Sequence, residues 1–486
     1  MSRKVFFALF LLSSLVGRAA QASPSLQTKA GRTASIQVNT TDDELNDDGD
    51  CSLREAIRAA NQDQVVSACT AGSGADTILI PAGTYNLSRM GTDDTGQLGD
   101  LDLTGSVTLQ GASNTTAIIN AGAGGGIFDR VFDVQPGASV TLTGMTIQGG
   151  VDNGFGGGGI RNQGTLTLAN VLVIANSSSA CGGGLYNSLN STTSVNTVSF
   201  GNNQASHGGG ICNDGKLALH NTSLTFDQAS GSGGGIFNNT EATLERVTIA
   251  SETANLHGGG IYNTGDITIT NSTIQDNTAT TGNGGGVFGG WITMTNTTLY
   301  NNQASTGNGG GIYHVFHLAL TNVTLSANSA ASGSGGGVYA LSYYDATLIN
   351  VTLMGNSAAS GSGVFRNNSQ GGKLQLKNTI LRNALSGGNC GGSITSLGHN
   401  IDSGNTCGFT QSGDQINTNP LVGALANNGG TTQTHALLPG SPAINAGDNN
   451  GCPAVDQRGY PRLGGCDIGA FEFLTRLSLP LIMKSP

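Results

Sequence analysis

The chain has 486 residues, of which 78 are Gly, 10% are charged and 5% are aromatic. Ordinary soluble domains carry roughly 25% charged residues. The formal net charge of -10 argues against nucleic-acid binding, which requires clustered Lys and Arg. Outside the N-terminus no apolar run approaches the ~20 residues of a membrane-spanning helix, so we expect no transmembrane helix. Asn, Ser, Thr and Gly carry the polarity, which is typical of turns and stacked strands.

The N-terminus predicts a secreted protein. Arg3 and Lys4 precede the apolar run VFFALFLLSSLVG, and Ala20-Gln21-Ala22 offers a small-x-small cleavage site. This pattern predicts a signal peptide over residues 1–22, too short for a spanning anchor. Residues 23–36 read as a linker, and we expect a monomer that is secreted or held at the cell surface.

An acidic loop opens the next segment, residues 37–74. Six of the 30 Asp and Glu residues lie between Asp42 and Asp50. Their spacing is that of an EF-hand loop with Glu at its first position, which predicts a Ca²⁺ site whose ligands are Glu44, Asn46, Asp48, Asp50 and Glu55. The alternative is a solvated acidic linker in which Glu55 caps a helix.

A helix is predicted directly after this loop. Ser52-Leu53-Arg54-Glu55 fits a capping box, and an apolar helical face follows at Leu53, Ala56, Ile57 and Ala60. This face is suited to covering one end of a repetitive fold. Residues 75–150, which begin with the strand-turn-strand pattern DTILIPAGTYNL, then lead into the repeats.

A repeat of 25 or 26 residues fills residues 151–385. Each unit has a glycine trio followed by an aliphatic residue: Ile160, Leu185, Ile211, Ile236, Ile261, Val287, Ile312, Val338 and Val364. Such a period predicts a solenoid, and period-two stretches such as DITIT and HLALT indicate strands rather than helices. We therefore predict an all-β parallel β-helix with about three short strands per coil.

Two columns of the repeat are interpreted as structural. The glycine trio permits backbone angles and close approaches that a Cβ would forbid. Asn occupies one turn position in seven coils, where stacked amides can bond along the column: Asn170, Asn221, Asn271, Asn296, Asn322, Asn350 and Asn378.

Acidic exceptions to the repeat suggest catalysis. Asp227 and Glu252 stand where other coils have Asn, and adjacent coils would place their carboxyls roughly 5 Å apart. That separation suits a retaining glycosidase or a cation, and His207 and His257 precede glycine trios at the same corner. The alternative is a turn that accepts any small polar residue.

Aromatic exceptions suggest ligand binding. Trp291, the only Trp, shares a column with His317 and Asp345, and Tyr343 and Tyr344 adjoin it. Aromatic faces beside polar groups suit sugar rings. Charge pairing and aromatic packing along a turn are the alternative.

The eight cysteines suit an oxidising compartment. Proximity predicts the disulfides Cys51–Cys69, Cys390–Cys407 and Cys452–Cys466. Cys181 and Cys212 remain, and whether they pair stays open.

Several motifs resemble known families. CSLREAI (51–57) followed by ADTILIPAGTY resembles the CSLREA-type segment of secreted bacterial β-helix proteins. The GGGI repeats with Phe200-Gly-Asn-Asn203 resemble polymorphic outer membrane protein repeats. NPLVGALANNGGTTQTHALLPGSPAINAGD (419–448), DQRGYPR and DIGAFEF resemble a choice-of-anchor Q domain. These resemblances imply a right-handed, pectin-lyase-like β-helix, secreted or surface-displayed, and no catalytic residues.

The C-terminal resemblance implies a disulfide-rich cap over residues 386–473. Residues 474–486 are apolar with a basic end, which fits either a sorting tail or a frayed terminus.

The sequence thus favours an adhesin-like protein that binds an extracellular polysaccharide or cell-surface glycan, with Ca²⁺ as its one candidate cofactor. A polysaccharide lyase or glycoside hydrolase is the alternative. Against it, none of the NTD, GHG and RIK motifs of polygalacturonase-like enzymes occurs in the chain.

Overall fold

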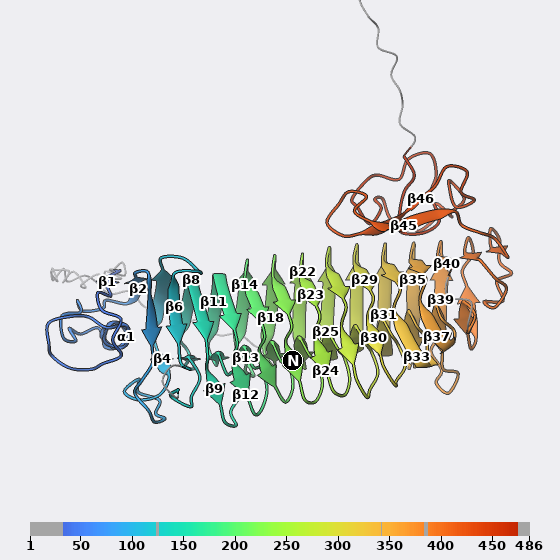
Figure 1. Ribbon diagram of the computed structural model, residues 1–486. Coiled ribbons are helices and arrows are strands. Elements are labelled where there is room, and N and C mark those ends of the chain that lie inside the picture. Colours follow the sequence, from blue (N-terminus) through green and yellow to red (C-terminus); the bar gives the residue numbers. More distant parts are fainter. Residues whose placement is uncertain (1–32, 123–125, 342, 383–386, 475–486) are drawn as a thin grey trace, which may run out of the picture.

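The computed structural model describes residues 33–122, 126–341, 343–382 and 387–474. The predicted signal peptide, most of the predicted linker and nearly all of the apolar tail lie outside these residues. The described chain is a long solenoid of parallel strands, with one helix at its N-terminal end and a C-terminal segment folded against one side (Figure 1). The predicted β-helix is confirmed.

The N-terminal cap forms as predicted. Helix α1 (Leu53–Gln62) begins at a capping box, in which the Ser52 side chain accepts from the Glu55 N–H and the Glu55 side chain accepts from the Ser52 N–H. Leu53 and Ile57 are buried on its apolar face, and the helix packs against the first strands of the solenoid. The Cys51–Cys69 disulfide fixes both ends of this segment.

Each regular coil has strands on four faces, whereas about three strands per coil were predicted. The first face follows the glycine trio and contains β4 (Leu101–Leu103), β7 (Phe132–Val134), β10 (Ile160–Asn162), β13 (Leu185–Asn187), β17 (Ile211–Asn213), β21 (Ile236–Asn238), the starts of β25 (Ile261–Thr270), β28 (Val287–Thr295) and β31 (Ile312–Thr321), then β34 (Val338–Ala340), β38 (Val364–Arg366) and β41 (Cys390–Gly391).

The second face comes next in each coil. It contains β1 (Ser35–Gln37), β2 (Ala75–Ile80), β5 (Ser106–Gly111), the starts of β8 (Ser139–Gln148) and β11 (Thr165–Ile174), β14 (Thr192–Asn196), β18 (Lys216–His220), β22 (Glu241–Glu245), the ends of β25, β28 and β31, then β35 (Ala346–Ile349), β39 (Leu374–Lys377) and β42 (Ile394–Ser396).

The third face joins the first two in one continuous sheet. It contains β3 (Gly83–Asn86), β6 (Ala117–Asn120), the ends of β8 and β11, β15 (Ser199–Gly201), β19 (Ser223–Thr225), β23 (Thr248–Ala250), β26 (Thr273–Gln275), β29 (Thr298–Tyr300), β32 (Thr324–Ser326), β36 (Thr352–Met354), β40 (Ile380–Arg382), β43 (Ile401–Asp402) and β44 (Gln415–Ile416).

The fourth face is a separate sheet of very short strands. It contains β9 (Val151–Asp152), β12 (Ser177–Ser178), β16 (Gln204–Ala205), β20 (Gln228–Ala229), β24 (Thr253–Ala254), β27 (Thr278–Ala279), β30 (Gln303–Ala304), β33 (Ser329–Ser334) and β37 (Ser357–Ser360).

The glycine trios close the coil between the fourth and first faces. The first glycine has a positive φ, for example +70° at Gly233. The second lies against the next coil, because a Cβ on Gly234 would stand 2.3 Å from the Gly259 carbonyl oxygen. Both expected reasons for glycine, the backbone angle and the close approach, are confirmed.

The Asn column predicted from the repeat occupies the turn between the second and third faces. Its residues adopt positive φ, such as 51° at Asn296. The amide of Asn296 donates to Asn271 Oδ1 at 3.3 Å, and that of Asn322 donates to Asn296 Oδ1 at 3.3 Å. The structural interpretation of this column is confirmed for these coils.

The C-terminal region has two parts. Residues 387–416 complete the last coils and close the core, with Cys390–Cys407 and Phe409 buried at the end. The chain then turns back and lies along the third face, where β45 (Val422–Ala426) and β46 (Thr434–Leu437) form an antiparallel pair (Figure 1). Gln457 and Arg462 bond Thr298 and Asn322 of the coils. The Cys452–Cys466 disulfide is confirmed.

Candidate functional site

The carboxylate pair predicted from the repeat is inside the molecule. Asp227 and Glu252 are both 0% exposed. They belong to a buried column at the turn between the third and fourth faces. Its members are Asn176, Asn203, Asp227, Glu252, Asn277, Asn302, Asn328 and Asn356.

Amides set the bonding pattern of this column. The Asn277 amide nitrogen donates to Asn302 Oδ1 at 2.9 Å and to the Ile249 carbonyl of the preceding coil at 3.1 Å. We call this column the inner ladder. An amide satisfies it because one side of the group accepts and the other donates.

The two acids fit the ladder imperfectly. Asp227 Oδ1 accepts from the Asn203 amide at 2.9 Å and Glu252 Oε2 accepts from the Asp227 N–H at 2.6 Å, but Asp227 Oδ2 and Glu252 Oε1 are buried without a partner. Burial raises the pKa of Asp227 to about 7, and burial together with the charge of Asp227 raises the pKa of Glu252 well above its usual range. The expectation of an accessible catalytic pair is therefore wrong. The repeat places the two carboxylates in one column, but that column faces the core.

The histidines predicted beside this pair do not join it. The His207 ring lies 5.0 Å from Phe237 and the His257 ring 4.8 Å from Phe288. His207 Nδ1 accepts from the Ser232 N–H at 3.2 Å and His257 Nδ1 accepts from the Asn283 N–H at 3.0 Å. Burial lowers the pKa of both imidazoles, which favours the neutral ring with its proton on Nε2.

These rings border a stack of aromatic side chains that the sequence interpretation missed. Neighbouring centroids lie 4.8 to 5.3 Å apart and their planes differ by 2° to 10° along Phe237, Tyr262, Phe288, Tyr313, Tyr339 and Phe365. The signal was present, because each follows the aliphatic residue after a glycine trio. Since each ring covers the face of the next, the stack stabilises the first face and offers no free ring face to a ligand.

The aromatic residues predicted as a ligand site do come together. Trp291 lies 5.8 Å from His317 and 5.5 Å from Tyr344, and Tyr343 lies 5.9 Å from Phe316, which the sequence interpretation missed. We call Trp291, Phe316, His317, Tyr343 and Tyr344 the aromatic patch. Trp291, Tyr343 and Tyr344 are 43%, 49% and 55% exposed.

Ring orientation separates the patch from the stack. Phe316 and Tyr343 are tilted by 45°, and Phe316 and Tyr344 by 63°. Trp291 and His317 lie closer to parallel, at 29°, and the partly exposed rings of the patch leave apolar aromatic surface open to a ligand. Asp345 does not extend the patch, because its carboxylate accepts from the Lys373 N–H and the Gln375 amide of the next coil.

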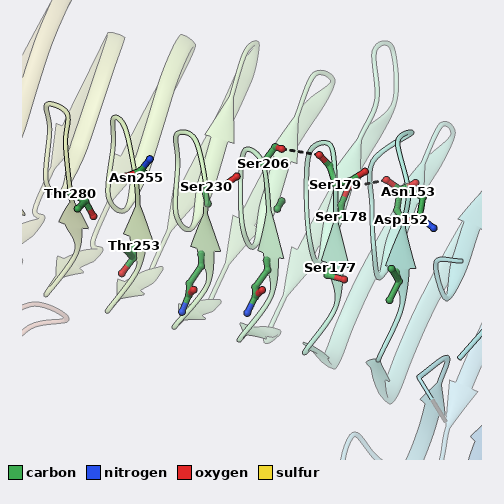
Figure 2. A pocket seen from close by; sticks show the side chains of 15 residues that line it. Asp152, Asn153, Ser177, Ser178, Ser179, Ser206, Ser230, Thr253, Asn255 and Thr280 are labelled. Carbon is green, nitrogen blue, oxygen red and sulfur yellow. Dashed lines mark hydrogen bonds between the residues drawn. The ribbon is translucent and has the colours of Figure 1, made fainter. Parts of the chain in front are cut away.

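A shallow groove on the fourth face is a second feature that sequence reasoning missed. It has a volume of about 500 Å³ and crosses six coils, from Asp152 and Asn153 to Thr280 (Figure 2). Within this lining, exposed polar residues alternate along each strand with buried small residues, for example Ala205 and Ala229. The sequence signal is a Gln, Ser or Thr before each buried small residue.

Beyond one end of the groove lies a buried charge network, also missed. Arg130 Nη1 is 2.9 Å from Asp100 and Arg130 Nη2 is 3.0 Å from Asp152, while Asp133 and Asp129 lie within 3.7 and 3.8 Å. Burial raises the pKa of Asp100 to about 9. Arg130 is therefore the cation that balances several buried carboxylates.

A carboxylate cluster adjoins this network. Ligand atoms of Asp94, Asp102 and Asp133 lie within 4.8 Å of one another. Asp133 already pairs with Arg161, and the Gln135 amide donates to both Asp102 and Asp133. Because internal partners occupy the oxygens of Asp102 and Asp133, these two buried carboxylates are explained as structural.

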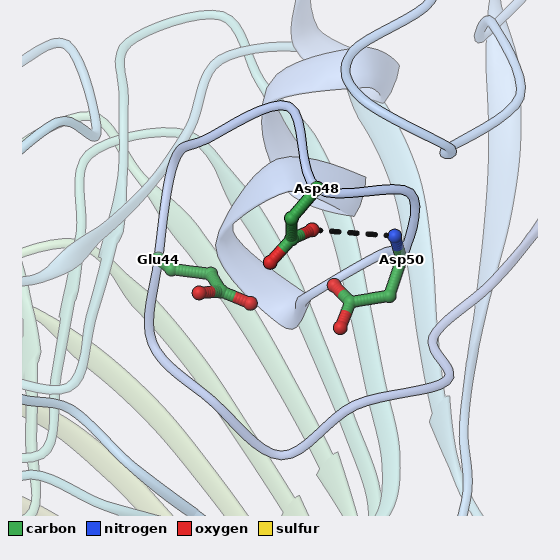
Figure 3. Close-up of side chains that lie close together, drawn as sticks. All are labelled: Glu44, Asp48 and Asp50. Atoms are coloured by element: carbon green, nitrogen blue, oxygen red, sulfur yellow. Dashed lines mark hydrogen bonds between the residues drawn. The ribbon is translucent and has the colours of Figure 1, made fainter.

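The predicted calcium loop is only partly assembled. Carboxylate oxygens of Glu44, Asp48 and Asp50 lie within 4.8 Å of one another (Figure 3). Glu44 Oε1 and Asp50 Oδ1 are shielded from solvent without a hydrogen-bond partner. Partial burial, followed by the charge of Asp48, raises the pKa of both side chains. A divalent cation would offset most of the negative charge of these three carboxylates.

The other two predicted ligands are otherwise engaged. Glu55 accepts from the Ser52 N–H at 3.0 Å and from the Asn46 N–H at 3.1 Å, so it serves the helix cap. The Asn46 amide donates to Glu44 Oε2. Glu55 is therefore taken up by the helix cap, and the three carboxylates of Glu44, Asp48 and Asp50 remain as the candidate.

Calcium binding at this cluster predicts a measurable stabilisation. Ca²⁺ at 100 times its dissociation constant should add about 2.7 kcal/mol to the free energy of unfolding. Thermal unfolding should therefore occur at higher temperature in Ca²⁺ than in chelator. Asp48→Asn should abolish the difference, and Asp47→Asn, outside the cluster, should keep it. Equal melting temperatures in Ca²⁺ and chelator would exclude the site.

Comparisons with known proteins add little. No family model and no curated protein matches the chain. Four chains of solved structures match, among them the crystal structure of pectate lyase Pel9A, with 14% identity over 92% of this chain and 97% of that chain and a TM-score of 0.34. An identity and a TM-score this low carry no argument about activity. The resemblances to CSLREA-type, polymorphic outer membrane protein and choice-of-anchor Q segments rest on their motifs alone.

Proposed function

We propose that this chain is an extracellular, adhesin-like protein, secreted or displayed at the cell surface, that binds polysaccharide through the aromatic patch. The observation that carries the proposal is the gathering of five rings from β28, β31 and the 343–344 turn at one exposed corner. Proteins normally bury large aromatic side chains, and a contiguous exposed group of them marks an interaction site.

Sugar is the ligand class that fits this corner. Pyranose rings have apolar faces that stack on aromatic side chains and hydroxyl edges that need polar partners. His317 and the two tyrosine hydroxyls supply polar edges within the patch. The formal net charge of -10 argues against a nucleic-acid ligand, whose phosphates need clustered cations.

The disulfides support an extracellular location. Cys181 and Cys212, whose pairing the sequence left open, form a fourth disulfide, so all eight cysteines are paired. Disulfides persist in oxidising compartments. Among the described residues, no helix is long and apolar enough to cross a membrane.

The alternative is a lyase or hydrolase that acts through Asp227 and Glu252, and it lacks an accessible catalytic site. Both carboxyls are 0% exposed and both belong to the inner ladder. A polysaccharide cannot contact them without opening the core, so binding is the better-supported activity.

Loss of the patch should weaken binding without unfolding the protein. Trp291→Ala combined with Tyr344→Ala should reduce affinity for the preferred polysaccharide at least tenfold, which corresponds to about 1.4 kcal/mol. Retention in affinity gels that contain the polymer measures the change. Phe226→Ala is the matched control, because Phe226 is 58% exposed but lies outside the patch. Unchanged retention of the double variant would show that the patch is not the binding site.

A further inference from the structure

The groove on the fourth face presents two parallel rows of side chains. The row on the strands contains Ser177, Gln204, Gln228 and Thr253, whose Cα positions are in register from coil to coil. The row beside it contains Asn153, Ser179, Ser206, Ser230, Asn255 and Thr280 (Figure 2). Because each row advances by one coil, its members repeat at about 4.8 Å along the solenoid.

The groove offers no free charge. Asp152 is the one ionisable residue among those that line it, and its carboxylate is saturated. Oδ1 accepts from Arg130 and the Phe155 N–H, and Oδ2 accepts from the Ser178 hydroxyl and the Gly156 N–H. A charged polymer would therefore find no counter-charge in the groove.

Three side chains of the strand row are free to bond a ligand, whereas Ser206 and Ser178 already donate to neighbouring coils. The side chains of Gln204, Gln228 and Thr253 are exposed and make no hydrogen bond within the described chain. The inner ladder differs, because the amides of Asn277 and Asn302 donate hydrogen bonds to the neighbouring coils. Amides and hydroxyls both donate and accept, which matches the hydroxyl groups of a sugar.

We propose that this groove is a second binding site, for an uncharged linear polysaccharide whose chain runs along the solenoid axis. A polymer of identical units can meet uncharged polar side chains of the two rows at successive coils. Six coils span about 24 Å at the ~4.8 Å spacing. The site extends the proposed function to a second surface and shares no residue with the aromatic patch.

Other polymers fit less well. A nucleic acid requires cationic side chains, and none lines the groove. A peptide that adds as a strand needs an open sheet edge with unpaired backbone groups, whereas the groove exposes the face of paired strands. The repeated, uncharged and hydroxyl-rich lining favours the neutral polysaccharide.

The test compares full-length protein and three variants in affinity gels that contain hydroxyethylcellulose, glucomannan, arabinoxylan or polygalacturonate. Gln204→Ala/Gln228→Ala removes two amides from the groove. Gln303→Ala is the matched control, because Gln303 occupies the same column but lies outside the groove. Trp291→Ala/Tyr344→Ala removes the patch.

We expect the groove variant to bind at least one neutral polymer tenfold more weakly, at unchanged melting temperature, and Gln303→Ala to bind like the unaltered protein. A loss confined to the patch variant would overturn the groove and support the patch. A loss confined to the groove variant would do the reverse. Retention on polygalacturonate alone, or on none of the four polymers, would overturn the groove.

A chain-length series gives an independent readout. Isothermal titration with neutral oligosaccharides of increasing length should show affinity that rises until the chain spans the groove, about five coil steps at ~4.8 Å each. In the groove variant this rise should disappear. Affinity that is independent of length in the unaltered protein would contradict axial binding.

Discussion

Arg130→Met should destabilise the N-terminal coils by about 3 to 5 kcal/mol, the usual result of removing one partner from a buried ion pair. Arg130 is 6% exposed and contacts the carboxylates of Asp100 and Asp152 at 2.9 and 3.0 Å. Without the guanidinium the buried Asp100 carboxyl would lose its ion-pair partner, and Asp152 would lose one of its hydrogen-bond donors. Urea unfolding, together with hydrogen exchange over coils 100–152, measures the effect.

Arg246→Met is the matched control for this prediction. Arg246 pairs with Glu245 at 3.2 Å, but the two side chains are 47% and 40% exposed. Exposed pairs contribute about 0 to 1 kcal/mol, so this variant should unfold close to the unaltered protein. Equal stability of the Arg130 and Arg246 variants would show that the network is not balanced by Arg130.

Asp227→Asn combined with Glu252→Gln should stabilise the protein at pH 8. Each substitution places an amide where a buried carboxyl oxygen has no partner. In the neighbouring coil the Asn277 amide donates to the Ile249 carbonyl, and the new amides can donate in the same way. Each unit by which folding raises the pKa of a carboxyl lowers the free energy of unfolding at high pH by about 1.4 kcal/mol.

The pH dependence gives this prediction its sign. The folded pKa of Asp227, about 7, lies above its ordinary value of 3.8, so the folded state favours the protonated acid. The contribution of Asp227 to the free energy of unfolding is full below pH 3.8 and is lost as pH rises through about 7. The neighbouring ladder residues Asn203 and Asn277 are uncharged.

Differential scanning calorimetry of the double variant and the unaltered protein should therefore show similar melting temperatures at pH 4. The variant should melt several degrees higher at pH 8. Subtracting the two profiles removes the contribution of His207 and His257, whose lowered pKa acts in the opposite direction. A difference that is the same at both pH values would refute buried proton binding at the pair.

The repeat predicted most of the fold because its period is a direct consequence of stacking. A residue that recurs every 25 or 26 positions, such as Ile236 and Ile261, must occupy equivalent points of neighbouring coils, and these two residues are register partners. The helix was predictable for a local reason, since Ser52 and Glu55 satisfy each other's backbone N–H groups. The return of residues 417–473 along the third face was not, because it depends on contacts between distant segments.

Residues at equivalent positions of the repeat lie side by side in neighbouring coils, and this rule predicted the arrangement of one candidate site correctly and that of the other wrongly. It brought Trp291 and His317 together, because they are register partners across two strands. It also aligned Asp227 with Glu252 but could not tell which way they point. A preceding residue with positive φ, such as Phe226 at 61°, turns the chain there, and the spacing of the repeat does not reveal that turn.

The charge network around Arg130 could not be predicted from the repeat, because it depends on tertiary packing. It joins residues from separate coils and the loop before β4, including Asp100 and Asp152. Asp100 lies before the regular repeats and Asp152 at their start. Only the packing of the entry coils brings them to one place.

The fluorescence of Trp291 tests the central claim most directly, because it is the only Trp in the chain and belongs to the patch. Titration with the polysaccharide that retains the protein should change the emission saturably, with the midpoint found in affinity gels. The Phe226→Ala variant should give the same curve. Unchanged emission during retention would place the polysaccharide away from the patch and contradict the account.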